Sequence, residues 1–301
     1  MTQHLIHVGY PKTGSNFLRQ WFSTHPQLAY AEGGIAGWHD VHQISAQAAQ
    51  PLHEILYRVT SSEGLAAPHA SIGQLTMDYA RVDYTGAPAT QARVAGVLAQ
   101  QFPNARILVV TRGFRSMILS AYSQIIRIGG SVDFAEFCSS LRSAAARDAD
   151  GWNYSRLLNL YIGHFGAANV LAMPYELMRD ELESFTDSLE RWLGLVRGPV
   201  ARERLNVSLS AVELAWYLRL TQSMQALPLP RLQRKLMRSY LRAVMQNRLR
   251  DVIPMLQKLL PLTPITAESL SAATVECFRG HADTLRHDPL YARYSEEYLF
   301  T

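Results

Sequence analysis

The stretch HVGYPKTGSNFLRQWF, from His7 to Phe22, decides the fold of this chain. The apolar run Leu5–Val8 leads into it and predicts a strand, and Gly9 to Gly14 predict a tight turn. From Ser15 onward the spacing predicts a helix whose apolar face holds Phe17, Leu18, Trp21 and Phe22. A strand, a glycine-containing loop and a helix in this order can bind phosphate, because N–H groups at the helix start and the helix dipole both favour an anion.

The loop departs from the pattern GxxxxGK[ST] of ATP-binding loops. Gly9 and Gly14 have the spacing of the two glycines, but Ser15 stands where that pattern has lysine, and Lys12 lies inside the loop. Phosphoryl transfer from ATP normally needs a bridging cation as well. We therefore interpret the loop as an anion site of another kind. A sulfuryl donor needs only a lysine near its bridging oxygen and donors around its phosphate.

The segment YPKTGSNF, Tyr10 to Phe17, resembles the 5′-phosphosulfate loop of sulfotransferases that use 3′-phosphoadenosine 5′-phosphosulfate (PAPS). The family pattern is roughly P-K-[ST]-G-T-[TS]; Asn16 departs from it, although its side chain can donate a hydrogen bond. The alternative is an ordinary strand, turn and helix with a surface lysine. The resemblance implies that Lys12 also stabilises charge on the leaving oxygen. It implies that the donor and its product PAP are bound by Lys12, Thr13, Gly14, Ser15, Asn16 and Phe17.

A second motif follows the clearest strand pattern, Arg106–Thr111, whose continuous apolar run is typical of a strand buried in a parallel sheet. Arg112 comes directly after it, the next helix opens at Gly113, and Ser120 lies eight residues beyond Arg112. Ligands of open α/β sheets bind at the carboxyl ends of strands. By the same resemblance, Arg112 and Ser120 bind the 3′-phosphate of PAPS. Alone, an arginine here would suggest a surface salt bridge; two motifs in the correct order favour the sulfotransferase interpretation.

The loop after a short predicted strand, Leu28–Tyr30, holds the densest group of acid–base side chains. In carbohydrate-type sulfotransferases a glutamate shortly after the second strand is the usual general base, and Glu32 lies at the matching place, although Ala31 replaces the family's neighbouring lysine. His39 is the second candidate, because its ordinary pKa suits proton transfer near neutrality. The alternative is a solvated loop with incidental histidines.

The remaining pattern predicts further elements and several roles. We expect Tyr175 and Glu176 to be structural, Arg115 to form an ion pair, and Arg127 to be solvated. Helical spacing is found in Gln50–Gly64, Thr90–Phe102, Asp133–Arg147, Trp152–Phe165 and Leu182–Leu193, while strands are predicted in 71–79 (followed by a loop) and Asn169–Met173.

From Ala211 the chain turns strongly helical, and arginines and lysines interleave with leucines between Arg231 and Arg250. A basic amphipathic helix can bind membrane surfaces or polyanions. We favour the commoner case, a helix that packs on the core and keeps its basic face in solvent.

The composition limits the class of protein and the partners that it can have. The 301 residues are 48% hydrophobic and 18% charged, as in ordinary globular proteins, and the net charge of +4 is too small to indicate nucleic-acid binding. Two cysteines exclude a disulfide framework. We see no signal peptide or membrane span, so we expect a cytoplasmic protein.

We therefore predict one three-layer α/β domain over 1–301, with a central parallel sheet flanked by helices. Residues 1–200 form its nucleotide-binding core and 201–301 a helical C-terminal part. The predicted activity is metal-free, in-line sulfuryl transfer from PAPS to a hydroxyl or amine of a glycan or small-molecule acceptor. Two alternatives remain: a phosphotransferase that uses ATP, and a non-catalytic binder of adenosine phosphates.

Overall fold

The computed structural model describes residues 3–30, 55–66, 87–147, 151–200 and 209–300. The predicted bases Glu32 and His39, and the strand and loop predicted in 71–79, lie outside these ranges. Within them, no helix is long and apolar enough to cross a bilayer.

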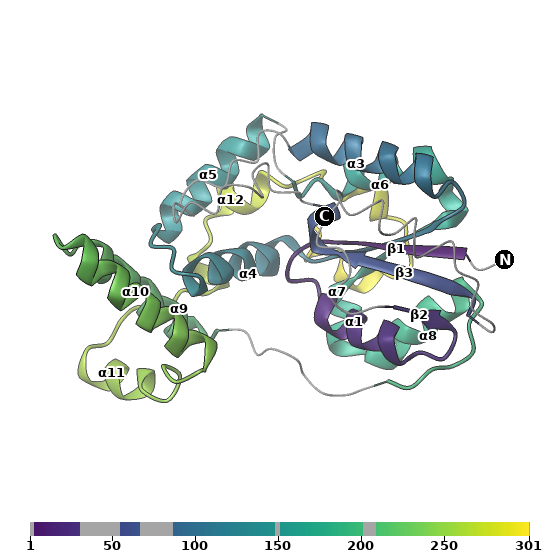
Figure 1. The fold of residues 1–301 in the computed structure, drawn as a ribbon. Helices are drawn as coiled ribbons and strands as arrows, with labels where there is room; N and C mark the ends of the chain where they lie inside the picture. The colour runs from purple at the N-terminus through teal and green to yellow at the C-terminus, as the bar shows by residue number, and fades with distance from the viewer. Residues whose placement is uncertain (1–2, 31–54, 67–86, 148–150, 201–208, 301) are drawn as a thin grey trace.

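A five-stranded parallel sheet in the order β2-β3-β1-β4-β5 forms the centre of the described structure. Helices α3 and α6 cover one face, and α1 and α8 the other, so the predicted three-layer α/β fold is confirmed (Figure 1). The strands are β1 (Gln3–Gly9), β2 (Leu28–Ala29), β3 (Tyr57–Ser62), β4 (Arg106–Thr111) and β5 (Val170–Pro174). The flanking helices are α1 (Ser15–Thr24), α3 (Ala87–Gln101), α6 (Tyr154–Phe165) and α8 (Leu182–Leu193).

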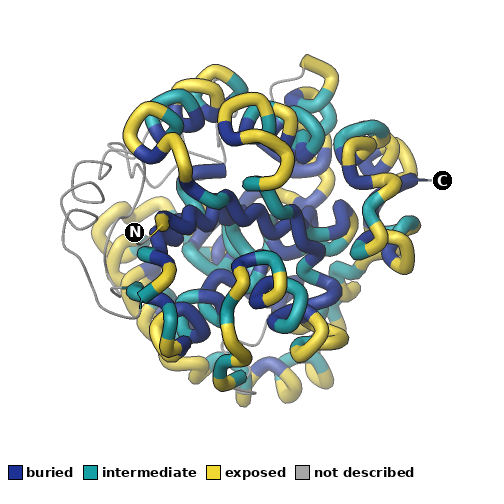
Figure 2. Tube along the Cα trace, turned by 90° about the vertical axis from the view of Figure 1, so that its right-hand side faces the viewer, coloured by how far each residue is buried: buried dark blue, intermediate teal, exposed yellow. Residues whose placement is uncertain are grey.

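The two strands that precede the predicted motifs are neighbours. β1 and β4 pair in parallel, with Gly9 opposite Val110, so both strands end at the same edge of the sheet. Their apolar side chains are fully buried, as Figure 2 shows for the centre of the molecule. The sheet thereby brings the loop after β1 and Arg112 together.

The helix predicted in Gln50–Gly64 is wrong where the structure describes it, because Tyr57–Ser62 is strand β3. Short apolar runs fit either period, and tyrosine, valine and threonine favour strands. Pairing with β1 then makes this segment a strand. Two buried histidines of β1 stabilise the pairing, since His4 Nε2 lies 2.8 Å from Thr60 Oγ1 and His7 Nδ1 lies 2.8 Å from Ser61 Oγ.

The other described helices each bury at least one apolar residue. They are α4 (Phe114–Arg127), α5 (Phe134–Ala146), α7 (Tyr175–Asp180), α9 (Ala211–Gln225), α10 (Pro230–Met245), α11 (Ile253–Leu259) and α12 (Ala272–Glu276). Single 3₁₀ turns are η2 (Glu63–Leu65), η3 (Ala167–Asn169), η4 (Ala267–Ser269), η5 (Asp283–Leu285) and η6 (Ala292–Tyr294).

The C-terminal third divides between two places. Helices α9, α10 and α11 lie beside α4, at one end of the molecule, whereas the chain from α12 onward returns to the sheet (Figure 1). There Phe278 stacks on Phe114 with ring centroids 5.2 Å apart, and Tyr291 and Tyr298 are fully buried. The last segment of the chain is therefore part of the core beneath Arg112.

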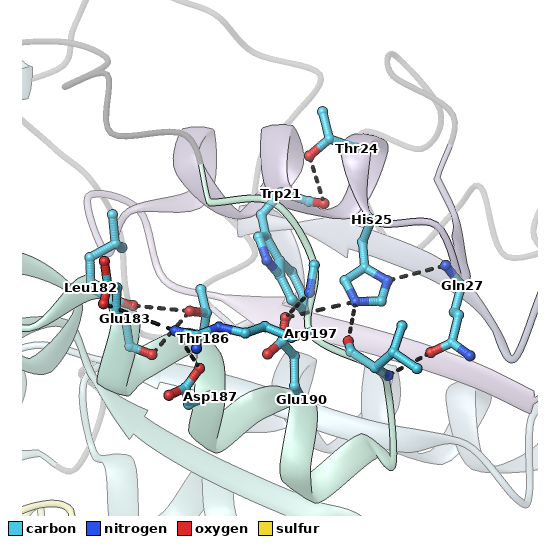
Figure 3. A network of polar contacts seen from close by, with 12 residues as sticks. Trp21, Thr24, His25, Gln27, Leu182, Glu183, Thr186, Asp187, Glu190 and Arg197 are labelled. Atoms are coloured by element: carbon cyan, nitrogen blue, oxygen red, sulfur yellow. Dashed lines mark hydrogen bonds and ion pairs between the residues drawn. The ribbon is translucent and has the colours of Figure 1, made fainter.

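A polar network fixes α1, the helix that follows the loop after β1 (Figure 3). His25 Nε2 donates to the carbonyl of Val196 at 3.1 Å, and His25 Nδ1 accepts from the Gln27 N–H at 3.2 Å. The Gln27 side chain accepts from the Val196 N–H at 2.8 Å. A neutral His25 satisfies both of its bonds, so the C-terminal end of α1 is locked to the segment after α8.

Candidate functional site

The loop between β1 and α1 is tightly folded. Lys12 has a φ of 69° and Gly14 a φ of 86°, so both adopt the left-handed conformation, which is strained for lysine. The Thr13 hydroxyl donates to the carbonyl of Tyr10 at 2.7 Å and closes the turn. A methyl group on Gly14 would overlap the sulfur of Met178 on α7. The loop therefore has little freedom to rearrange.

The start of α1 keeps its hydrogen-bond donors for a ligand. No side chain caps it within the described structure, and its first turn holds no acidic residue. Ser15 is buried, and its hydroxyl has no hydrogen-bond partner among the described residues. Asn16 accepts a hydrogen bond from Arg19 through its side-chain oxygen, so its amide N–H₂ can still donate. Phe17 is half-buried and packs against the core.

Arg112 joins the two predicted motifs directly. Its Nη1 donates to the backbone carbonyl of Lys12 at 2.7 Å, and its Nε donates to Ser116 Oγ at 2.9 Å. A guanidinium has five N–H donors, so three of them have no hydrogen-bond partner among the described residues and can bind a ligand. The two motifs, remote in sequence, form one site at the edge where β1 and β4 end.

Neighbouring groups hold Arg112 in place. Its guanidinium carbon lies 4.6 Å from the ring centroid of Tyr175, and its carbonyl accepts a hydrogen bond from the Tyr154 hydroxyl at 2.7 Å. Tyr175 was expected to be only structural, so its contact with Arg112 was missed. The available signal was position, because Tyr175 opens the helix that follows β5, the strand next to β4.

Glu176 is structural, as predicted, and it supports the start of α4. Its fully buried carboxylate accepts from the Gly113 N–H at 3.0 Å and from the Tyr298 hydroxyl at 2.9 Å. The Tyr298 hydroxyl also lies 3.0 Å from Thr111 Oγ1, which in turn lies 2.8 Å from the Tyr291 hydroxyl. The residues on both sides of Arg112 are thus tied to the C-terminal segment.

Ser120 lies on α4 beyond Arg112, where it is buried and its hydroxyl has no hydrogen-bond partner in the described part of the chain. A buried hydroxyl without a partner is costly, and a ligand oxygen would satisfy it. Arg115 on the same helix is exposed, and the ion pair predicted for it is absent among the described residues. Only charge and helical position had supported that prediction.

Lys12 lies in a positive environment. Burial lowers its pKa, and the charges of Arg127 and Arg112 lower it further, while Glu63 raises it. Arg127, which is predicted to be a solvated helix residue, is half-buried in the last turn of α4, and its charge acts on Lys12. Glu63 opens η2 directly after β3, the other neighbour of β1. Sequence reasoning missed it because this segment was assigned to a helix.

Of the predicted site residues, the structure therefore brings together the loop from Lys12 to Phe17 and Arg112, and it places Ser120 on the helix that Arg112 precedes. Glu32 and His39 lie outside the described residues. Within those residues, no group of three His, Cys, Asp or Glu side chains could hold a metal ion.

The chain is similar to known proteins in its sequence and in its backbone. The sequence model described as "Sulfotransferase family" matches residues 5–197, which include both motifs, most of β1 and all of the other four described strands. A crystal structure of a sulfotransferase from Alicyclobacillus acidocaldarius is similar over 74% of this chain and 93% of its own, with 14% identity and a TM-score of 0.48. A mouse sulfotransferase, SULT7A1, solved with PAP, is similar over 75% of this chain and 68% of its own, with 15% identity and a TM-score of 0.39. No protein with curated annotation matches the chain.

Proposed function

The chain belongs to the sulfotransferase family, and we propose that it transfers a sulfuryl group from PAPS to a hydroxyl or amine of a glycan or small-molecule acceptor. The observation that carries this proposal is the 2.7 Å hydrogen bond from Arg112 to the carbonyl of Lys12. It joins a loop suited to a 5′-phosphate with an arginine suited to a 3′-phosphate, and ATP or AMP would use only the first. The proposal that the enzyme works in the cytoplasm rests on sequence alone.

The residues present fit such a donor. The start of α1 and the side chains of Lys12 to Phe17 would hold the 5′-phosphosulfate, and Arg112 and Ser120 would hold the 3′-phosphate. The buried hydroxyls of Ser15 and Ser120, which have no partner among the described residues, support this assignment. Bound PAPS supplies the sulfuryl group and a phosphate leaving group.

Lys12 supplies positive charge where the leaving oxygen becomes negative. Such fixed charges act mainly on the transition state and contribute strongly to catalysis. The strained backbone of Lys12 and its bond to Arg112 fix the position of the lysine before a ligand binds. Burial lowers the pKa of Lys12, and a bound anionic donor would favour its charged ammonium form, which is the form that carries the charge.

The acceptor proton must pass to a base within hydrogen-bond reach. Glu32 and His39 remain our first and second candidates from the sequence. Glu63 joins them, because it follows the strand next to β1 and its charge acts on Lys12. We would measure Glu32→Gln, His39→Asn and Glu63→Gln side by side at saturating donor. Loss of the base should lower kcat by roughly two to four orders of magnitude with PAP affinity almost unchanged.

Calorimetry with PAP and AMP tests the donor assignment. We expect PAP to bind far more tightly than AMP, and Arg112→Ala to weaken PAP binding by about 1.5–3 kcal/mol, the range for a lost charge-assisted hydrogen bond. Arg115→Ala is the matched control, because this exposed arginine lies three residues further on, in the first turn of α4. Equal affinity for PAP and AMP in the parent protein would overturn the assignment of Arg112 and Ser120.

The two alternative functions are separated by further ligands. Tight binding of ATP–Mg with weak binding of PAP would favour the phosphotransferase. Transfer of labelled sulfate from PAPS to any member of an acceptor panel would exclude the non-catalytic binder. A non-catalytic binder would bind PAP but would transfer no sulfate, whether or not Lys12 is present.

A further inference from the structure

Exposed apolar side chains gather in one part of the molecule. Nine large apolar residues are exposed within the described ranges, and seven of them lie between 229 and 260. These seven are Leu229, Leu232, Leu236, Val252, Met255, Leu259 and Leu260. They belong to the region of α10 and α11, which stands at the end of the molecule away from the sheet (Figure 1). The clustering separates them from the scattered apolar residues found on any protein surface.

Helix α10 packs along only part of its apolar face. Met237, Tyr240 and Val244 are buried, and the Tyr240 hydroxyl donates to the carbonyl of Ile126 at the end of α4, at 3.0 Å. Before Met237 the apolar side chains are no longer covered, because Leu232 and Leu236 are 40% and 37% exposed. The predicted packing on the core therefore holds only for the C-terminal half of α10.

The exposed leucines share a face and border a strongly basic one. Leu229, Leu232 and Leu236 are spaced by three and four residues, which places them on one side of the helix. The helix also holds five basic residues and no acidic one: Arg231, Arg234, Lys235, Arg238 and Arg242. All five are exposed.

We infer that the N-terminal half of α10 binds a membrane surface that contains anionic phospholipid. The leucines would enter the boundary between headgroups and acyl chains, and the arginines and Lys235 would contact lipid phosphates. A soluble polyanion would use the basic residues alone and would leave the apolar stripe without a role. A second copy of this chain would set two basic helices against each other, and like charges oppose such a symmetric contact.

Vesicle co-sedimentation tests this inference with the full chain. The probes are vesicles of pure phosphatidylcholine and of phosphatidylcholine with a minority of phosphatidylglycerol. One double variant, Leu232→Ser with Leu236→Ser, removes apolar side chains, and another, Arg234→Gln with Lys235→Gln, removes charge. Val196→Ser and the pair Arg147→Gln with Arg191→Gln are matched controls, because these residues are exposed and lie outside α10.

We expect the parent to bind only the anionic vesicles. Loss of the two cations should weaken binding by roughly fivefold for each charge, and loss of the two leucines by about tenfold or more, with both controls unchanged. Far-ultraviolet circular dichroism and the thermal midpoint of the same proteins should match those of the parent, which establishes that the variants fold. The vesicle assay contains no donor, so its result and that for the proposed function are independent.

Three results would overturn the inference. The parent could fail to bind anionic vesicles. Binding could respond to the charge variant but not to the leucine variant, and dextran sulfate could compete for it, which would indicate a polyanion site. Light scattering could show a dimer that the leucine variant dissociates, which would make this face an interface between copies.

Discussion

Mild acid should destabilise this protein through the two histidines of β1. Burial lowers the pKa of His4 to about 4, with a further contribution from Arg58, and the pKa of His7 to about 3, with a further contribution from Arg19. Unfolded, both should titrate near about 6.5. Folded-state pKa values below the unfolded value mean that the unfolded chain binds protons first. The stability is complete above about pH 6.5 and is lost as pH falls towards 4 and 3.

The size of this effect follows from linkage. Between pH 7 and pH 5, each histidine should lower the free energy of unfolding by about 2 kcal/mol, or about 4 kcal/mol together. That is a large share of the roughly 5–15 kcal/mol that stabilises a typical domain. Other groups titrate in this range as well, so the informative quantity is a difference between variants.

The perturbation is the double variant His4→Gln with His7→Asn, whose amides can still bond to Thr60 and Ser61 but cannot be protonated. Urea unfolding at pH 7, 6 and 5, followed by circular dichroism, gives the free energy of unfolding. We expect the parent to lose about 4 kcal/mol more than the double variant over this interval. His164→Gln is the control, because His164 is exposed on α6. Parallel pH profiles for the parent and the double variant would refute the reasoning, whatever their absolute stabilities.

Three further changes probe the site. Lys12→Ala should lower kcat more than it weakens PAP binding in calorimetry; a preserved kcat with lost affinity would make Lys12 a binding residue only. Gly14→Ala should lower the thermal midpoint and PAP affinity, because Gly14 has a positive φ and an added methyl group would overlap with Met178. Gly163→Ala on α6 is the control: an added methyl group meets no atom there, so the change should be neutral or stabilising by up to about 1 kcal/mol. Tyr298→Phe should cost about 1–3 kcal/mol in urea unfolding, since it leaves a buried carboxylate short of a donor; an unchanged midpoint would contradict that role.

The parts of this fold that could be predicted are those determined by short, continuous stretches of sequence. Strand β4 is a continuous apolar run, and the loop from Lys12 to Phe17 has a specific residue order. The resemblance assigns Lys12 and Arg112 to one donor, and ligands of α/β sheets bind at the edge where parallel strands end, so the meeting of these two residues was expected in outline.

The parts that were missed depend on contacts between distant segments. Nothing near β3 in the sequence states that it pairs with β1, and its short apolar run fits a helix equally well. That error concealed Glu63. The ring of Tyr175 beneath Arg112 is likewise fixed by the neighbouring position of β4 and β5, which no local pattern encodes.

The bond between Tyr298 and Glu176 has a consequence for biosynthesis. During synthesis the sheet-forming residues emerge before the segment that secures the start of α4. A nascent chain can collapse around its strands, but the surroundings of Arg112 stay incomplete until Tyr298 has been made. Such long sequence separations between contacting residues slow folding, and they make the ligand-binding conformation a late event. Donor affinity would then report on the completion of folding.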